Sequence, residues 1–394
     1  MGQPLLHAID FIPYEVGKSI EEIDMFEHFL AIYYRLNGLP RVKVCDIKTG
    51  EFHEVDFRRR EDVFSVVPGV NLEYRSQTIR LIYSSPLCYS KTLEYDMKAK
   101  KLSVLKTTTL DGPHIHTSKL VCRRVEVPAH DGNTIPLTLF HNREVAKDRK
   151  NRVVLKGYGA YGTFSDNQFK LAELSAVEEG WIVATAHVRG DAEKGREWHE
   201  AGKFASKRNS FEDYLSCAAY LIAEGYTKSQ YMAAWGASAG GLLVAQTINR
   251  HPELFKAAVL EVPFVDVLNL MLDEGQALTL PEREEWGDPL HDPAIFDEMR
   301  SYSPYENLWH TDYPALYITA GLRDPRVPYW SIAKYVKRLR QRMMPRTGAR
   351  FGKDDVLFEV TDSGHFGGGD KLKEEAFLWA FLGAQIPSPH LNLD

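Results

Sequence analysis

Short apolar segments separated by turn residues dominate the first 118 residues. They predict strands at Phe29–Leu36, Arg41–Ile47, Phe52–Phe57, Ile79–Ser84, Lys91–Met97 and Leu102–Lys106. Asn37-Gly38 and Thr49-Gly50 are turn dipeptides between neighbouring segments, and short connections of this kind are typical of antiparallel strands. This part of the chain is therefore predicted to form antiparallel sheet.

A weak internal repeat runs through the same region. Asp46 and Asp96 each begin a polar segment between two predicted strands, and they lie 96 − 46 = 50 residues apart. A period near 50 suits the four-stranded blades of a propeller. One small antiparallel sheet explains two copies equally well, so both interpretations stay open on the sequence alone.

From about Leu120 the pattern changes to alternating strands and helices. Asp131-Gly132 predicts a hairpin between Leu120–Pro128 and Ile135–Phe140. Further strands are expected at Arg152–Leu155, Trp181–Ala186, Tyr231–Trp235, Ala257–Glu261, Ala315–Ala320 and Val356–Val360. Helices are expected at Leu171–Glu179, Ser210–Glu224, Gly240–Asn249, Trp330–Met343 and Lys373–Leu382. The alternation indicates a mostly parallel α/β sheet with helices on both faces, as in the α/β-hydrolase fold.

The clearest chemical motif is the G-x-S-x-G at residues 236–240, placed between a predicted strand and a predicted helix. A serine on such a tight turn needs neighbours with almost no side chain. The turn lifts the hydroxyl to a helix N-terminus, where negative charge is favoured. Ser238 is therefore the predicted nucleophile; a Gly/Ala-rich helix packing site is the alternative.

A serine nucleophile needs a base and an orienting acid, which follow it in this fold. Asp324 and His365 come directly after two predicted strands, where ligand chemistry occurs in open α/β sheets. Taken singly, Asp324 suits a helix N-cap and His365 a surface loop; together they predict a triad with Ser238. Asp362 is the second candidate for the acid. His187 is the second candidate for the base, although its position before the serine favours a packing role.

An oxyanion hole requires two hydrogen-bond donors. The backbone N–H of Ala239, directly after the nucleophile, is one candidate. The other is expected from the loop Gly157–Gly162 (GYGAYG), which follows the Arg152–Leu155 strand. Its glycines permit close backbone approach, and a tyrosine hydroxyl can donate as well as an N–H.

Charge and composition exclude several other classes of protein. Lys and Arg number 48 against 54 Asp and Glu, a net charge of −6, and without a polybasic segment neither nucleic acid nor an anionic membrane is an expected partner. No apolar run approaches the ~20 residues of a membrane span, the N-terminus does not resemble a signal peptide, and the four cysteines form no C-x-x-C, so the cytosol is the expected location. His114 and His116 are more typical of a strand or linker than of a zinc site, and no metal or cofactor is expected.

Several motifs together resemble the prolyl oligopeptidase family. They are GYGAYG, HVRG with a following Trp198-His199, GASAGG, TAGLRDPRV and DSGHFG, in that family's order, while EVPFVDVLNLML and Glu284-Glu285-Trp286-Gly287 are similar to its oligopeptidase B branch. The resemblance implies a serine peptidase that cleaves short peptides, with an α/β-hydrolase domain capped by a β-propeller. It assigns Ser238, Asp324 and His365 to the triad, Tyr158 to the oxyanion hole and Arg326 to the substrate backbone.

The resemblance also predicts specificity and domain bounds. Glu282 and Glu284 match two carboxylates that face basic substrate side chains, for which bidentate hydrogen bonds to Arg are the physical reason; a solvated helix turn is the alternative. Residues 1–117 would be the last blades of a partial propeller and 118–394 the catalytic domain.

This sequence also departs from the family. The family pattern R-G-G-G-E reads Arg189-Gly190-Asp191-Ala192-Glu193 here, which puts the shape of that loop in question. One relative acts as an esterase-like hydrolase, so a carboxylesterase or thioesterase, or a catalytically impaired truncated product, are the alternatives. The oligomeric state is not predicted.

Overall fold

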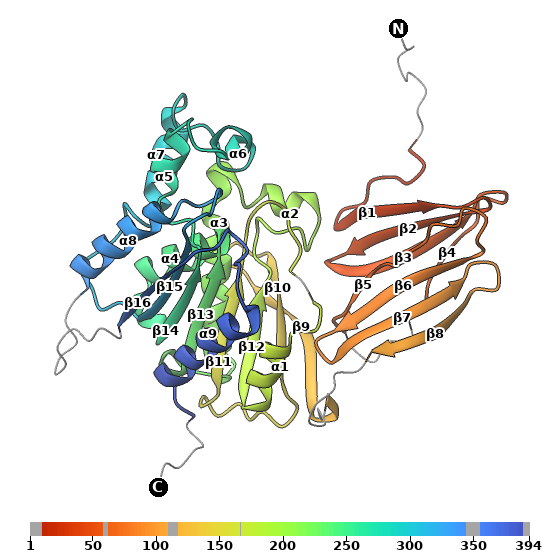
Figure 1. Cartoon of the computed structure of the whole chain (residues 1–394), viewed down its shortest axis with the longest axis horizontal. Coiled ribbons are helices and arrows are strands. Elements are labelled where there is room, and N and C mark those ends of the chain that lie inside the picture. Colours follow the sequence, from red (N-terminus) through yellow and green to blue (C-terminus); the bar gives the residue numbers. More distant parts are fainter. Residues whose placement is uncertain (1–9, 58–61, 109–116, 166, 344–354, 389–394) are drawn as a thin grey trace.

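The computed structural model describes residues 10–57, 62–108, 117–165, 167–343 and 355–388. Within these ranges the strands form two four-stranded sheets and one eight-stranded sheet. Figure 1 shows the two small sheets side by side at one end of the molecule, with the large sheet and its helices at the other. The predicted histidine pair, His114 and His116, lies outside the described residues.

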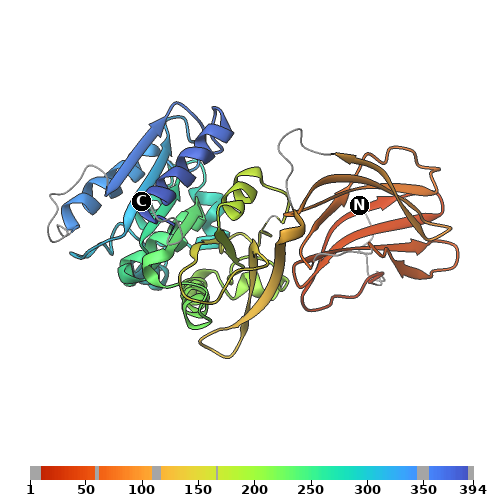
Figure 2. The same ribbon diagram turned by 90° about the horizontal axis from the view of Figure 1, so that it is seen from below.

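The two small sheets are consecutive antiparallel meanders. The first consists of β1 (Lys18–Met25), β2 (Phe29–Leu36), β3 (Leu39–Asp46) and β4 (Phe52–Glu54), and the second of β5 (Ser65–Pro68), β6 (Thr78–Ser85), β7 (Cys88–Asp96) and β8 (Lys101–Thr108). Alternate side chains of each sheet, such as Phe29 and Val44 on one side and Ile79 and Leu81 on the other, form a shared buried core. Figure 2 shows the two sheets stacked.

The 50-residue repeat corresponds to these two sheets. Asp46 Oδ1 accepts hydrogen bonds from the N–H groups of Lys48 and Thr49, at 2.9 and 3.1 Å. Asp96 Oδ1 accepts the equivalent bonds from Lys98 and Ala99, at 3.0 and 2.7 Å. The same side-chain turn therefore joins the third and fourth strand of each sheet. The two-blade interpretation of the repeat is confirmed, and the single small sheet is wrong.

The large sheet has the order β16-β15-β14-β13-β11-β12-β10-β9. Its strands are β9 (Leu120–Pro128), β10 (Thr134–Asn142), β11 (Arg152–Gly157), β12 (Trp181–Ala186), β13 (Met232–Ala237), β14 (Ala257–Glu261), β15 (Ala315–Gly321) and β16 (Val356–Thr361). The β9–β10 hairpin joins β12 in antiparallel fashion, and all other neighbours are parallel. The predicted hairpin and parallel strands are confirmed.

Helices cover both faces of this sheet because its strands are apolar on both sides. One face packs against α1 (Leu171–Glu178) and α9 (Lys371–Gln385), and the other against α3 (Arg208–Ala223), α4 (Ala239–Arg250) and α8 (Tyr329–Arg342). Along β11, Val154 faces the first group of helices while Val153 and Leu155 face the second. Four further helices were not predicted: α2 (Arg196–Glu200), α5 (Val267–Leu272), α6 (Thr279–Trp286) and α7 (Pro293–Tyr302).

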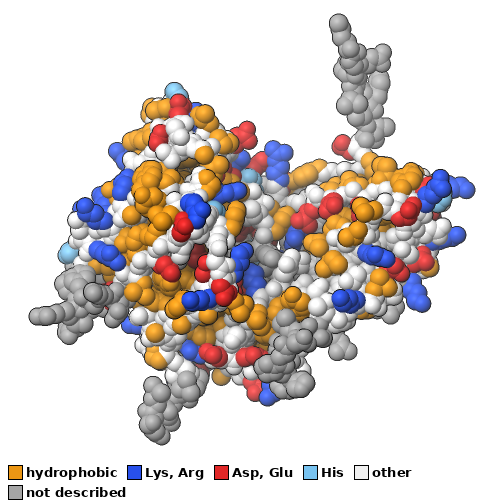
Figure 3. Space-filling view, viewed as in Figure 1, with side chains coloured by type: hydrophobic (Ala, Val, Ile, Leu, Met, Phe, Trp, Pro, Cys, Tyr) orange, Lys and Arg blue, Asp and Glu red, His pale blue; other side chains and the backbone are white. Residues whose placement is uncertain are grey.

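The small sheets contact the large one at several points. Arg124 Nη1 of β9 donates a hydrogen bond to Asn37 O in the β2–β3 turn at 3.1 Å. Just before α1, the rings of Tyr89 and Phe169 meet edge to face with centroids 5.4 Å apart, and the Phe169 N–H donates to Ser84 Oγ at 3.1 Å. The space-filling view in Figure 3 shows basic, acidic and hydrophobic side chains intermixed over both ends of the molecule. Among the described residues, no helix has the length and apolar character that crossing a bilayer requires.

Candidate active site

The turn between β13 and α4 holds Ser238 in a strained backbone conformation. Its φ is +53° and its ψ −118°, in a region that residues with a side chain rarely adopt. The chain can turn this tightly only because its neighbours are glycines: a Cβ on Gly236 would lie 2.0 Å from Gly240 O, and a Cβ on Gly240 would lie 2.5 Å from Gly157 O. The local sequence therefore dictates the turn that the motif predicted.

Backbone hydrogen bonds hold the strained serine in place. The Ser238 N–H donates to Glu261 O of β14 at 2.9 Å, and Ser238 O accepts from the Phe264 N–H at 3.0 Å. Ala239, the next residue, is buried and begins α4. The first N–H groups of a helix have no acceptor within it, so the Ala239 N–H can serve a ligand beside Ser238.

Asp324 and His365 meet at the carboxyl ends of two adjacent strands. Asp324 follows β15 and His365 follows β16, and the two strands pair in parallel through Gly321 and Thr361. Asp324 Oδ2 lies 2.7 Å from His365 Nδ1. Its other oxygen, Oδ1, accepts the backbone N–H groups of Arg326 and Val327 at 2.8 and 3.0 Å.

The carboxyl group of Asp324 stays ionised although it is buried. Burial alone would raise its pKa, but the hydrogen bonds from His365 and from the two backbone N–H groups outweigh this effect, and the pKa is lowered. A negative charge hydrogen-bonded to Nδ1 stabilises a protonated imidazole and leaves Nε2 available for proton transfer.

The two alternative residues are engaged elsewhere. The Asp362 carboxylate is 70% exposed and pairs with the Arg323 guanidinium at 2.5 Å, rather than with His365. His187 is fully buried, with Nε2 2.7 Å from Thr138 Oγ1 and Nδ1 2.7 Å from Glu193 Oε1. Burial lowers the pKa of His187. The position of His187 is that of a packing histidine, as its place in the chain suggested.

Tyr158 lies close to Ser238, whose side chain acts on the pKa of the Tyr158 hydroxyl. Burial, followed by the charge of Asp191, raises the pKa of Tyr158 to about 12. Its hydroxyl therefore stays protonated at physiological pH and can donate a hydrogen bond. Tyr158 reaches this place from the loop after β11, in which Gly159 adopts a φ of +75°.

Glu282 and Arg326 also face this region, since the charges of both act on the Tyr158 hydroxyl. Glu282 is half-buried on α6, where Trp286 Nε1 donates to its carboxylate at 3.3 Å. Burial raises the pKa of Glu282 despite its hydrogen bonds and the nearby Arg326. Arg326 is exposed, and its guanidinium lies 5.1 Å from the ring centroid of Phe366, which in turn stacks edge-on against His365.

The structure does not bring Glu284 to Glu282. Residues two apart on a helix point about 200° away from each other, and Glu284 is exposed while Glu282 is half-buried. The two side chains therefore lie on different sides of α6, and the contact of both with basic substrate side chains stays a prediction. The inward carboxylate is Glu285, which is 6% exposed, accepts the Tyr161 N–H at 2.9 Å and lies 2.7 Å from His199 Nε2.

Sequence reasoning missed Glu285, Tyr161 and His199 as supports of the site. The available signal was that Tyr161 in GYGAYG, Trp198-His199 and Glu284-Glu285-Trp286 all occur among the family motifs. Nothing in the order of residues along the chain shows that His199 and Glu285 come together, because the contact joins α2 to α6 across 86 positions.

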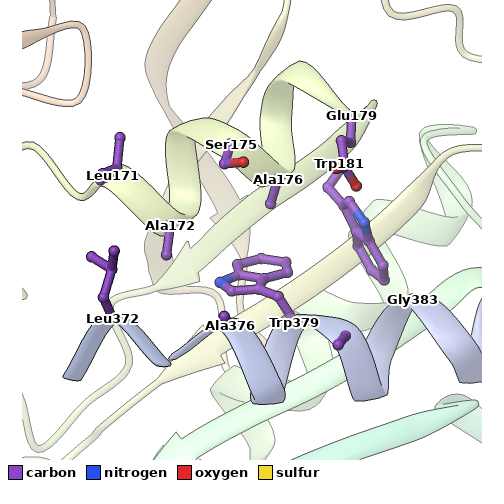
Figure 4. A pocket seen from close by; sticks show the side chains of 11 residues that line it. Leu171, Ala172, Ser175, Ala176, Glu179, Trp181, Leu372, Ala376, Trp379 and Gly383 are labelled. Atoms are coloured by element: carbon purple, nitrogen blue, oxygen red, sulfur yellow. The ribbon is translucent and has the colours of Figure 1, made fainter. Parts of the chain in front are cut away.

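The predicted site and an unrelated apolar groove occupy different places in the fold. A cavity of about 290 Å³ is lined by His365 and by Ala237, the residue before Ser238, among others. An apolar groove of about 460 Å³ lies between α1 and α9, lined by Trp181 and Trp379 among others (Figure 4). This groove contains none of the predicted site residues.

Two family models and several known proteins match this chain. A model described as the prolyl oligopeptidase family matches residues 167–388, and one described as the prolyl oligopeptidase N-terminal β-propeller domain matches residues 6–108. The dipeptidyl aminopeptidase BI of Pseudoxanthomonas mexicana is 34% identical over 383 residues, which is 96% of this chain and 51% of that protein. The human prolyl endopeptidase-like protein is 33% identical over 358 residues, or 90% of this chain and 48% of the relative.

Solved structures show the same fold. Oligopeptidase B from Trypanosoma brucei, solved with covalently bound antipain, aligns with a TM-score of 0.88 and 35% identity over 97% of this chain and 54% of that one. Oligopeptidase B from Leishmania major aligns with a TM-score of 0.86 and 32% identity over 94% and 52%. The chain thus spans about half the length of the relatives it matches. The predicted fold class, propeller-type sheets before an α/β-hydrolase unit, is confirmed, and the chain belongs to the prolyl oligopeptidase family.

Proposed function

We propose that this chain is a serine peptidase of the oligopeptidase B type, with residues 118–394 as its catalytic domain and Ser238, Asp324 and His365 as its triad. One observation carries the proposal. A serine in a strained strand-to-helix turn and a carboxylate–imidazole pair lie at the carboxyl edge of the same sheet. Strain of this kind persists where function requires it.

The reaction follows from the positions of the polar groups. His365 Nε2 takes the proton of Ser238 as Oγ attacks the scissile carbonyl, and the oxyanion forms against the Tyr158 hydroxyl and the Ala239 N–H. His365 then gives the proton to the leaving amine as the C–N bond breaks. Water repeats the same steps on the acyl-enzyme, while Asp324 holds the tautomer and stabilises the imidazolium.

The proposed substrates are short peptides with basic residues. Glu282 supplies a half-buried carboxylate close to Tyr158, and burial strengthens its attraction for a guanidinium. Arg326 is proposed to hydrogen-bond the substrate backbone, as the resemblance to the family implies. Glu284, which is exposed on another side of α6, is left with at most a contact at the rim of the site.

A fluorophosphonate probe tests the nucleophile directly, because it reacts only with an activated serine. Labelling of the wild type but not of Ser238→Ala is expected. Absence of labelling in the wild type, or equal labelling of both proteins, would refute the triad and favour an impaired product.

A substrate panel then separates peptidase from esterase. We expect turnover of an Arg-Arg peptide amide well above that of a Gly-Pro amide. Hydrolysis of a simple aryl ester without any amide turnover would overturn the peptidase assignment and leave a carboxylesterase or thioesterase on the same triad.

A further inference from the structure

The loop Arg189–Glu193, where this chain departs from the family's glycine-rich pattern, lies directly against the loop that carries Tyr158. The Gly162 N–H donates to Gly190 O, and the Ala192 N–H donates to Thr163 O, both at 2.9 Å. A Cβ on Gly190 would lie 2.1 Å from Gly159 O. The two loops are therefore in backbone contact. Of the three glycines in the family pattern, this chain keeps only Gly190, and the contact leaves no room for a side chain there.

Asp191, which stands where the family pattern has a glycine, uses its side chain in this contact. The residue is fully buried, and its Oδ1 accepts the Gly159 N–H at 2.7 Å. Among the described residues, Oδ2 has no hydrogen-bond partner. One oxygen of the carboxyl group thus holds the backbone N–H that directly follows Tyr158.

A second buried group holds the same peptide segment from its other side. Lys207 Nζ donates to Gly159 O, and to Gly202 O at 3.2 Å. Burial lowers the pKa of Lys207 to about 8, against the charges of Glu285 and Asp191. Gly159 has no side chain and a φ of +75°, so these external groups fix its conformation.

We propose that Asp191 is a positioning residue that holds the Gly159 N–H and thereby keeps the Tyr158 hydroxyl at Ser238. The proposal rests on the proposed function, in which Tyr158 stabilises the oxyanion. A donor in an oxyanion hole must lie about 2.7–3.1 Å from the developing charge. Because Tyr158 is the residue next to Gly159, movement of that peptide displaces the hydroxyl.

The surroundings of Asp191 make the hydrogen bond to Gly159 costly to lose. Three ionisable groups surround Asp191: Glu193 on the same loop, Lys207 just before α3, and Tyr158 on the facing loop. The charges of His187 and Arg124 in turn lower the pKa of Glu193. Burial and the charge of Glu193 raise the pKa of Asp191. An N–H left without this acceptor in a buried site would have to find another or move.

Steady-state kinetics on an Arg-containing peptide amide tests the proposal. Asp191→Ala is expected to lower kcat by about 10- to 100-fold, because an oxyanion donor acts mainly in the transition state, with KM changed by less than about threefold. Asp191→Asn keeps an acceptor oxygen for the Gly159 N–H and is expected to stay within about threefold of the wild-type kcat.

A double-mutant cycle shows whether Asp191 acts through Tyr158. In a Tyr158→Phe background, Asp191→Ala should lower kcat by less than about threefold further, because the hydroxyl that it positions is already gone. If Asp191→Ala costs the same factor in both backgrounds, or costs nothing in the wild type, the positioning role is wrong.

A matched control, Asn151, directly precedes β11, the strand whose other end leads into the Tyr158 loop. Asn151 is buried and its Nδ2 donates to Ala146 O and Tyr226 O, both at 2.7 Å. Asn151→Ala removes these two hydrogen bonds from the side chain to the backbone, at the end of β11 opposite to Tyr158. It should lower the stability of the protein without changing kcat. An equal loss of kcat in this control would attribute the Asp191 effect to general destabilisation.

Hydrogen exchange separates failure of this inference from failure of the proposed function. Amide exchange in a peptide covering residues 157–162 should be faster in Asp191→Ala than in the wild type and unchanged in Asp191→Asn. This readout needs no activity, so it still decides the role of Asp191 if the wild type neither labels nor turns over substrate. Unchanged exchange in Asp191→Ala would overturn the inference.

Discussion

The turn at Ser238 and the helix that carries Glu282 both face the candidate site, but different parts of the chain determine their conformations. The turn is set by five consecutive residues: glycines at 236 and 240 have no room for a Cβ, and the strand and helix on either side bury their apolar faces. The sequence of helix α6 does not determine which side of the helix packs inward, because TLPEREEW carries charges at half of its positions.

Contacts distant in sequence hold α6 in place instead. Its Trp286 is buried against Phe264 and Tyr161, with ring centroids 5.4 and 5.7 Å apart, and Glu285 binds the Tyr161 N–H and His199. The conformation of the Ser238 turn is therefore determined by its local sequence, whereas the position of α6 depends on contacts with the rest of the fold. Mutations should therefore affect the two in different ways.

The largest effect is expected from Gly236→Ala in the nucleophile turn. The new methyl group would lie 2.0 Å from Gly240 O, so the turn must open and Ser238 must move. We expect probe labelling to fall by about 10⁵-fold or more, close to the effect of losing the nucleophile itself. Gly383→Ala on α9 is the control, because no atom lies within 4 Å of its Cβ position, and it should be neutral or stabilise the protein by about 0.5–1 kcal/mol. Normal labelling of Gly236→Ala would show that the turn is not sterically determined.

Asp324→Asn should have the next largest effect. It removes the charge that orients His365 while keeping nearly the same shape, and a fall in kcat of about 10⁴-fold is expected. Asp362→Asn is the matched control, three residues from His365 and paired with Arg323 in solvent, and should change kcat by less than about twofold. Equal effects of the two substitutions on kcat would mean that the acid of the triad is misassigned.

The fold could be predicted wherever hydrophobic periodicity was strong. All eight strands of the large sheet were predicted: β9 and β10 from the hairpin turn between them, and the others from apolar runs, which are continuous where a strand is buried on both faces. Strand β1 was missed because its residues are mostly exposed and it reads KSIEEIDM. Strand β5 is only four residues long. Helices α5 to α7 lie between β14 and β15, outside the regular alternation of strand and helix.

The site could be predicted only as far as its residues follow strand ends. Asp324 and His365 were placed by their strands, and the structure brings them within hydrogen-bonding distance. The partner of Glu282 could not be deduced, because helical phase depends on which side of α6 packs inward. The hydrogen bond from Gly159 to Asp191 joins loops 32 residues apart, and only the fold makes it visible.

A smaller, substrate-dependent effect is expected from Glu282→Gln. It should lower kcat/KM for Arg substrates by about 10- to 100-fold through loss of a charged contact, with little change for a neutral residue at the same position. The same substitution at Glu284 should change either value by less than about twofold, since that side chain is exposed on another face of α6. A larger loss from Glu284→Gln would mean that α6 rotates or shifts when substrate binds, and that specificity follows the sequence pairing rather than the observed helical phase.

The smallest expected effect is a pH dependence of the preference for Arg over neutral substrates, which should follow Glu282 on α6 rather than the Ser238 turn. Burial raises the pKa of Glu282, so in the free enzyme its charge is lost at a higher pH than that of an ordinary glutamate as the solution is acidified. The ratio of kcat/KM for an Arg substrate to that for a neutral one should therefore fall as the pH drops through that raised pKa. Asp324 has a lowered pKa and remains ionised over the same range, so it does not contribute to the fall. In Glu282→Gln the ratio should be low and independent of pH. A ratio that still falls with acidification in that variant would place the titrating group on another residue and detach specificity from α6.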